Sequence, residues 1–209
     1  MIVLSHRGYW QDAKEKNQEI AFSRSFDLGF GTETDIRDRN GSLVISHDMP
    51  SGSELTLSDF LRIVDGRDLP LALNIKADGL VGVLKDALQR SPLRKWFVFD
   101  MAVPDMRGYL QAGIPVFTRM SEVERAPAWL EQSAGVWLDG FSDVWYDAAT
   151  IETLLRTGKK VCVVSSELHG RNADVQWHML RGLSAHPGLM LCTDIPEKAQ
   201  NFFGDHIND

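Results

Sequence analysis

Nine short apolar runs, separated by longer amphipathic segments, restrict the fold of this chain more than any other feature of its sequence. Most runs hold four to six residues rich in Val, Ile, Leu or Phe, which is typical of strands buried on both faces. The runs are "IVLSH" (2–6), "GTETDI" (31–36), "SLVISH" (42–47), "LALNIK" (71–76), "WFVFD" (96–100), "IPVFTR" (114–119), "GVWLD" (135–139), "KVCVVS" (160–165) and "LMLCTD" (189–194). Amphipathic segments of helical length lie at 17–29, 79–91, 103–113, 146–158 and 174–186. This alternation predicts a parallel sheet in an α/β fold.

One pair of runs departs from the alternation. Asn40-Gly41 is a strong signal for a two-residue hairpin turn, so run 42–47 is expected to return antiparallel along run 31–36. The other eight runs then predict a compact TIM (β/α)8 barrel with a small β-hairpin after strand 2. An open doubly wound sheet is the alternative. No low-complexity linker divides the chain, and residues 1–209 are therefore expected to form a single domain.

Charge and cysteine content narrow the classes of partner and compartment. The formal net charge is −7, which disfavours a nucleic-acid-binding face. Cys162 and Cys192 lie inside apolar runs and are expected to be buried free thiols in a reducing compartment. The first run is too short for a signal peptide, and no run approaches the roughly 20 residues of a membrane span. We expect a soluble cytoplasmic protein, whose oligomeric state the sequence leaves open.

Nearly every apolar run ends in a polar or charged residue, at the end of the strand where TIM barrels carry their chemistry. One such residue only solvates a turn, but a ring that mixes imidazoles, carboxylates and cations requires a common ligand. The ends are His6-Arg7, Glu33/Asp35, Asn74/Lys76, Asp100, Thr118-Arg119, Asp139, Glu167 and Thr193-Asp194.

Glu33 and Asp35 are the most informative pair among these strand ends. They are two residues apart, so their side chains project in the same direction from a strand. Two neighbouring carboxylates disfavour each other's ionisation, and a divalent cation removes that penalty. Hard oxygen ligands suit Mg²⁺ or Ca²⁺ better than zinc. The alternative is a solvent-facing pair on an edge strand.

The order of these motifs resembles the glycerophosphodiester phosphodiesterase family. That family has an HRG strand end, an Asn at the start of the first helix, an ExD strand, a short polar hairpin and a strand that ends in HD. The matching residues here are His6-Arg7-Gly8, Asn17, Glu33-Thr34-Asp35, Asn40-Gly41 and His47-Asp48. The segment "CTDIPEKA" (192–199) is similar to the end of the family's final strand. The resemblance is close over the first fifty residues and moderate over the last twenty.

The resemblance implies a TIM barrel that hydrolyses phosphodiesters with the help of a divalent metal. His6 and His47 would act as general acid and base, and Arg7 would hold the phosphate. Glu33 and Asp35 would bind Mg²⁺ or Ca²⁺. These roles are chemically reasonable because imidazole titrates near neutrality and because cations offset charge that develops on phosphoryl oxygens.

Two positions depart from the family pattern. The family usually has a third metal-binding Glu shortly before the Lys of its third strand, whereas this chain has Asn74 before Lys76. An Asn side chain still offers a neutral oxygen ligand, but the site loses one negative charge. Candidates to restore that charge are Asp78, Asp100, Asp139 and Glu167. In addition, Lys16 replaces the Glu of the family's Pro-Glu-Asn.

Several further residues are candidates for substrate binding. Lys76 follows a buried strand and is expected to have an anionic partner. Glu167 and Arg171 follow the seventh strand, where TIM barrels often bind phosphate, although a plain polar loop would look the same. Trp10 comes shortly after HRG and could line the substrate mouth. The last residues, with His206, are expected to form a helix end and a solvated tail.

Three functions are compatible with these features. The first is hydrolysis of a glycerophosphodiester to glycerol phosphate plus an alcohol. The second is a phosphodiesterase of altered specificity, acting on a phosphodiester-linked sugar or an envelope precursor. The third is a non-catalytic barrel that binds a phosphorylated ligand.

Overall fold

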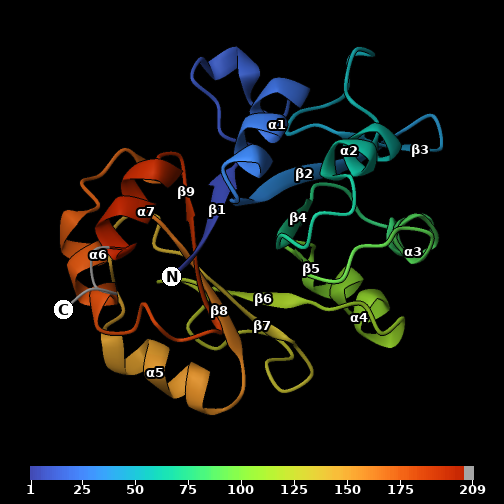
Figure 1. Cartoon of the computed structure of the whole chain (residues 1–209). Helices are drawn as coiled ribbons and strands as arrows, with labels where there is room; N and C mark the ends of the chain where they lie inside the picture. Colours follow the sequence, from blue (N-terminus) through green and yellow to red (C-terminus); the bar gives the residue numbers. More distant parts are fainter. Residues whose placement is uncertain (205–209) are drawn as a thin grey trace. The chain divides into compact units, whose positions relative to one another are not determined.

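The computed structural model describes residues 1–204, which divide into two compact units (Figure 1). The N-terminal unit is Ser5–Val116, and the C-terminal unit combines Met1–Leu4 with the chain from Phe117 onward. The parallel strands are β1 (Ile2–His6), β2 (Gly31–Arg39), β4 (Leu71–Ile75), β5 (Trp96–Phe99), β6 (Phe117–Met120), β7 (Gly135–Leu138), β8 (Lys160–Val164) and β9 (Leu189–Thr193), and β3 (Ser42–Ile45) runs antiparallel to β2. The helices are α1 (Glu19–Asp27), α2 (Leu57–Val64), α3 (Val81–Gln89), α4 (Val103–Gln111), α5 (Ala148–Arg156), α6 (Asp174–Arg181) and α7 (Pro196–Gly204), with short 3₁₀ turns η1 (Ala13–Glu15) and η2 (Ser166–His169).

The strand order confirms the predicted fold class. The hydrogen-bonded order is β5-β4-β2-β1-β9-β8-β7-β6, with β3 attached to β2. Read as a cycle, this is the chain order of the parallel strands in a (β/α)8 barrel, and a parallel bridge joins Val98 of β5 to Val116, just before β6. A doubly wound sheet reverses its strand order at a switch point, so that alternative is wrong.

In the N-terminal unit, β2 is paired on both sides. It runs parallel to β4, with Asp35 opposite Asn74, and antiparallel to β3, with Arg39 opposite Ser42. Asn40 and Gly41 turn the hairpin with φ angles of 50° and 79°, as a two-residue turn with two left-handed positions requires. The predicted hairpin is confirmed.

The helices of this unit pack on the sheet through aromatic side chains. Phe22 of α1 and Phe60 of α2 are fully buried, and their rings meet edge to face with centroids 4.7 Å apart. Thr56 caps α2 by accepting a hydrogen bond from the Asp59 N–H at 3.1 Å. The apolar faces of α1 and α2 therefore meet, with α1 against β2 and α2 against β3.

In the C-terminal unit, β6, β7, β8 and β9 pair in parallel. Trp177 of α6 is buried against Phe203 of α7, with ring centroids 5.7 Å apart. Cys162 and Cys192 are buried and not disulfide-bonded, as predicted. Within residues 1–204, no helix combines the length and apolarity that crossing a membrane would take. The predicted tail with His206 lies outside the described residues.

Candidate active site

The strand end His6-Arg7-Gly8 is a tight turn that places the His6 and Arg7 side chains beside β2. Arg7 and Gly8 both have left-handed backbone conformations, with φ angles of 60° and 81°. A Cβ on Gly8 would lie 2.8 Å from the Cβ of Ala21, so only glycine lets this turn approach α1. The Arg7 N–H donates to the Glu33 carbonyl at 3.0 Å, which ties the turn to β2.

Glu33 is buried at the centre of this arrangement. Its side chain is 2% exposed, its Oε2 lies 4.0 Å from His6 Nε2, and it accepts a hydrogen bond from the Arg7 N–H at 3.2 Å. Burial, and next the charge of Asp35, raise the pKa of Glu33 well above its ordinary value, although Arg7 and Lys76 act in the opposite direction. The two carboxylates are therefore close enough to repel each other, and the solvent-facing alternative is wrong.

Asp35 is fully buried, and its carboxylate is contacted by one neutral amide and two cationic side chains. Its Oδ2 accepts a hydrogen bond from Asn17 Nδ2 at 2.8 Å and lies 3.2 Å from Arg7 Nε. Its Oδ1 lies 3.4 Å from Lys76 Nζ but receives no hydrogen bond. Lys76 thus has the anionic partner that its position after β4 predicts.

Asn17 contacts the carboxylate strand through its side chain. The sequence motif indicated this residue only as the start of the first helix. It is buried, adopts a left-handed backbone with φ of 60°, and donates its backbone N–H to the Arg7 carbonyl at 2.9 Å. Its side-chain oxygen accepts the Thr34 hydroxyl at 2.9 Å, so the amide group that reaches Asp35 is the NH₂. Asn17 therefore locks the first loop onto the carboxylate strand.

The residues around Asp35 fit a hard divalent cation. Asp35 Oδ1 and Asn74 Oδ1 are both buried oxygens without a hydrogen bond, on residues paired across β2 and β4. Glu33 supplies a second buried carboxylate on the same strand. Among residues 1–204, no group of three or more His, Cys, Asp and Glu side chains could hold a metal ion, so the protein's third oxygen here would be the amide of Asn74.

His47 lies just beyond β3, and a backbone hydrogen bond from the Ser46 N–H to the Asp35 carbonyl at 3.0 Å fixes this segment. Its imidazole is 43% exposed, and Nδ1 is 2.9 Å from Asp48 Oδ1, a hydrogen bond that lowers the pKa of Asp48. Asp48 therefore orients the ring, and Nε2 is the ring nitrogen outside this contact. His6 and His47 belong to the same unit as Glu33 and Asp35.

Trp10 lies on the loop between β1 and α1, and the Lys16 ammonium sits 4.3 Å from the centre of its ring. Across residues 1–204, Lys16 forms no ion pair. The next residue, Asn17, is hydrogen-bonded to Arg7 and Asp35. Lys16 is therefore adjacent in the chain to a residue that contacts the buried carboxylate. This contact was not predicted, although Trp10 and Lys16 were both singled out.

Glu167 and Arg171 belong to the C-terminal unit and form local networks there. Glu167 accepts hydrogen bonds from the Ser165 and Thr193 hydroxyls and from the Asp194 N–H, the last at 3.2 Å. Arg171 donates to the Gly140 carbonyl. Their predicted roles in substrate binding stay predictions.

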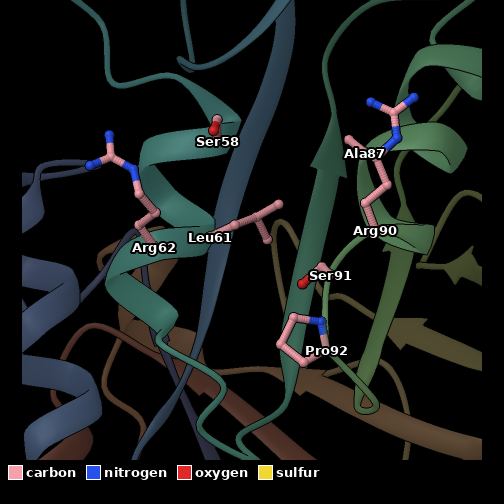
Figure 2. Close-up of a pocket in the computed structure, with 7 residues that line it drawn as sticks. All are labelled: Ser58, Leu61, Arg62, Ala87, Arg90, Ser91 and Pro92. Atoms are coloured by element: carbon pink, nitrogen blue, oxygen red, sulfur yellow. The ribbon is translucent and has the colours of Figure 1, made fainter.

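A separate groove of about 400 Å³ lies between α2 and α3 (Figure 2). It is lined by Ser58, Leu61, Arg62, Ala87, Arg90, Ser91 and Pro92. None of the predicted site residues is among them. The groove is therefore distinct from the cluster around β2.

Comparison with known proteins supports the fold assignment. No family model matches the chain, and no curated protein matches it. Among solved structures, an Oleispira antarctica phosphodiesterase in complex with its product sn-glycerol-3-phosphate is similar, with a TM-score of 0.73, 16% identity, and coverage of 98% of this chain and 97% of that one. A glycerophosphodiester phosphodiesterase from Agrobacterium tumefaciens has a TM-score of 0.68 at 15% identity, covering 98% of both chains. A glycerophosphoryl diester phosphodiesterase from Parabacteroides distasonis has a TM-score of 0.71 at 12% identity, covering 98% of this chain and 86% of that one. At these identities the likeness establishes a shared fold over nearly the whole chain.

Proposed function

We propose that this chain is a metal-dependent phosphodiesterase that hydrolyses a glycerophosphodiester to glycerol phosphate and an alcohol. The observation that carries the proposal is the convergence of two buried carboxylates, Glu33 and Asp35, with one imidazole and two cations, His6, Arg7 and Lys76. Such a cluster has no role in stability that an apolar core would not serve better. Its charges are suited to a phosphodiester and a divalent cation.

Glu33, Asp35 and Asn74 would hold the cation, Mg²⁺ or Ca²⁺, through carboxylate and amide oxygens. When bound, it would neutralise charge on the phosphoryl oxygens. Arg7 and Lys76 flank Asp35 on opposite carboxylate oxygens, and both would also face a phosphate bound next to that carboxylate. The protein would thus place positive charge around the group that becomes more negative in the transition state.

The two histidines would transfer the protons. One imidazole accepts a proton from water as the water oxygen bonds to phosphorus, the bond from phosphorus to the alcohol oxygen breaks, and the other imidazole donates a proton to that alcohol oxygen. His47 is suited to this because Asp48 holds Nδ1 at 2.9 Å and leaves Nε2 for the substrate. His6 is suited by its position, because its Nε2 lies 4.0 Å from Glu33 Oε2, beside the buried carboxylates.

The glycerophosphodiester is proposed as substrate on two grounds. The motifs around His6, Glu33 and His47 resemble those of the glycerophosphodiester phosphodiesterases. The Oleispira antarctica phosphodiesterase, which shares the fold, was solved with sn-glycerol-3-phosphate as its product. We further propose that the chain acts in the cytoplasm as one domain, since its two cysteines are buried and not joined in a disulfide.

The direct test measures glycerol phosphate release from a set of glycerophosphodiesters, with Mg²⁺, with Ca²⁺ and with excess chelator. We expect metal-dependent hydrolysis that His6→Ala or His47→Ala lowers by about 10²-fold or more. His178→Ala is the matched control. It removes an exposed imidazole from α6 and should retain full activity. Hydrolysis that survives both substitutions at the wild-type rate would refute the acid-base assignment. Metal binding without any hydrolysis would favour the non-catalytic phospholigand barrel.

A second candidate is a phosphodiesterase of altered specificity, and the contact between Lys16 and Trp10 favours it. A fixed ammonium occupies the aromatic surface that could otherwise hold a cationic head group. An alcohol with hydroxyl or anionic groups, such as a sugar or an envelope precursor, would suit this loop better than choline. Equal or faster cleavage of phosphodiesters that lack glycerol would support this candidate.

A further inference from the structure

Asp100 lies directly after β5 and contacts the residue that replaces the expected third carboxylate. Asn74 pairs with Phe99 across β4 and β5, so the next residue, Asp100, follows it at the end of the neighbouring strand. Asn74 Nδ2 donates a hydrogen bond to Asp100 Oδ2 at 3.3 Å. Both residues belong to the N-terminal unit.

This hydrogen bond determines which way the Asn74 amide faces. In this hydrogen bond Asn74 Nδ2 is the donor and Asp100 Oδ2 the acceptor, so the group that faces Asp100 is the NH₂ of Asn74. The amide oxygen is then directed away from Asp100. That oxygen is buried and receives no hydrogen bond, like Oδ1 of the register partner Asp35. Asp100 thereby leaves an oxygen ligand available next to Asp35.

The backbone of Asp100 agrees with a special role. Its φ angle is 64°, a left-handed conformation that residues other than glycine rarely adopt, although Asp and Asn tolerate it best. Such outliers at strand ends often accompany functional sites.

We infer that Asp100 is a positioning residue that compensates for the missing glutamate in two ways. It orients Asn74 so that the amide oxygen serves as a neutral metal ligand, and it adds behind that ligand the negative charge that asparagine lacks. Outer-shell carboxylates commonly act in this way on metal ligands. This inference rests on the proposed metal-dependent function.

Among residues 1–204, Asp100 is the acidic candidate to which Asn74 donates a hydrogen bond. Asp78 is exposed on the loop after β4. Asp139 and Glu167 belong to the C-terminal unit, where Asp139 lies 2.7 Å from His169 Nε2 and Glu167 accepts hydrogen bonds from the Ser165 and Thr193 hydroxyls. Asp100 is therefore the carboxylate that the geometry assigns to the site.

The test is calorimetric titration of Mg²⁺ and of Ca²⁺ into the full chain after treatment with chelator, which needs no substrate. Asp100→Asn removes the charge but keeps a residue that tolerates the left-handed backbone, so the variant is expected to fold, and its thermal unfolding is measured in parallel. We expect its metal affinity to fall by about 10-fold to 100-fold. The double variant Asn74→Asp with Asp100→Asn exchanges the two side chains and conserves net charge. We expect it to recover affinity to within about threefold of the wild type, because a carboxylate ligand would then be held by an amide donor.

Asp86→Asn is the matched control, because it removes one negative charge from the exposed face of α3. Its metal affinity should equal that of the unsubstituted protein. Equal affinities for Asp100→Asn and Asp86→Asn would overturn the inference and leave the proposed phosphodiesterase intact. Failure of the double variant to recover affinity would also overturn it. An unsubstituted protein that binds neither metal at millimolar concentration would overturn the inference and the metal-dependent function alike.

Discussion

Asp35 and Asn74 occupy the same register position on β2 and β4, and each keeps a buried oxygen that receives no hydrogen bond. A buried polar atom that receives no hydrogen bond costs about 1–3 kcal/mol. The ion pair with Lys76 at 3.4 Å offsets part of this cost for Asp35 Oδ1, and no contact among the described residues does so for Asn74 Oδ1. Glu33, two residues before Asp35, adds a buried carboxylate with a raised pKa. These strand ends therefore combine unfavourable groups that a bound cation would satisfy.

Glu33 should make the metal-free protein less stable as the pH rises. Burial and Asp35 raise its pKa above 4.5, so between 4.5 and the higher folded pKa the folded state keeps a proton that the unfolded chain releases. The free energy of unfolding must then fall as pH increases through this window. Glu33→Gln removes this titration, so in chelator the variant should be more stable than the wild type at pH 8 and should show a shallower pH dependence.

Urea unfolding between pH 4 and 9 in chelator measures this difference. The same substitution should weaken metal binding by about 100-fold or more, because it removes a charged ligand. Glu19→Gln, on the exposed start of α1, is the control and should leave both properties unchanged. Parallel pH profiles for wild type and Glu33→Gln would contradict the raised pKa.

Gly8→Ala should destabilise the protein by roughly 2–4 kcal/mol, combining left-handed strain with a steric clash. The added Cβ would lie 2.8 Å from both the carbonyl carbon and the Cβ of Ala21. Gly29→Ala is a matched control, since Gly29 has a φ of 80° and nothing within 4 Å of its added Cβ. The difference between the two variants in chemical denaturation isolates the clash. Equal losses of stability would show that α1 does not constrain the turn.

The sequence predicted the sheet well, because strands buried on both faces have compact apolar runs. The run 2–6 corresponds in full to β1, whereas β2 extends to Arg39 because its last residues pair with β3 in the hairpin. The run 114–119 was predicted to begin a strand earlier than β6, which starts at Phe117. Pro115 explains this difference, because it has no N–H to donate and only its carbonyl bonds to Val98.

The candidate site was predictable only in part, because sequence spacing does not show which distant segments come into contact. Glu33, Asp35 and His47 stand in a recognisable order along the chain, so sequence spacing suffices to group them. Asn17 and Asp100 join the site through left-handed backbone conformations and through contacts between distant segments, which spacing does not encode. The motif match named Asn17 and the strand ends named Asp100, but the contacts of both side chains required the strands to be in register.

Asn17→Gly should destabilise the chain by about 1–3 kcal/mol, although glycine fits the left-handed backbone at φ of 60°. The substitution removes the amide that donates to Asp35 at 2.8 Å and accepts from the Thr34 hydroxyl at 2.9 Å. Asn17→Asp should be worse near neutral pH, because it places a second carboxylate against buried Asp35. Chemical denaturation measures both changes. A more stable Asp variant than Gly variant at pH 8 would contradict the assigned hydrogen bonds.

Under the proposed function, Lys16 should determine which alcohol group of the substrate the chain accepts. Its ammonium lies 4.3 Å from the centre of the Trp10 ring, and the adjacent Asn17 is tied to Arg7 by a 2.9 Å backbone hydrogen bond. A cationic head group would meet both a like charge and an occupied aromatic face, so the wild type should prefer glycerophosphoglycerol to glycerophosphocholine. Lys16→Ala should reduce this preference about tenfold, since a cation–π contact is worth about 0.5–2 kcal/mol.

The measurement is the ratio of kcat/KM for the two substrates, and Lys14→Ala, on the exposed surface of η1, is the matched control. A ratio that shifts equally in both variants would assign the effect to the general charge of the loop, and an unchanged ratio in Lys16→Ala would remove Lys16 from substrate selection.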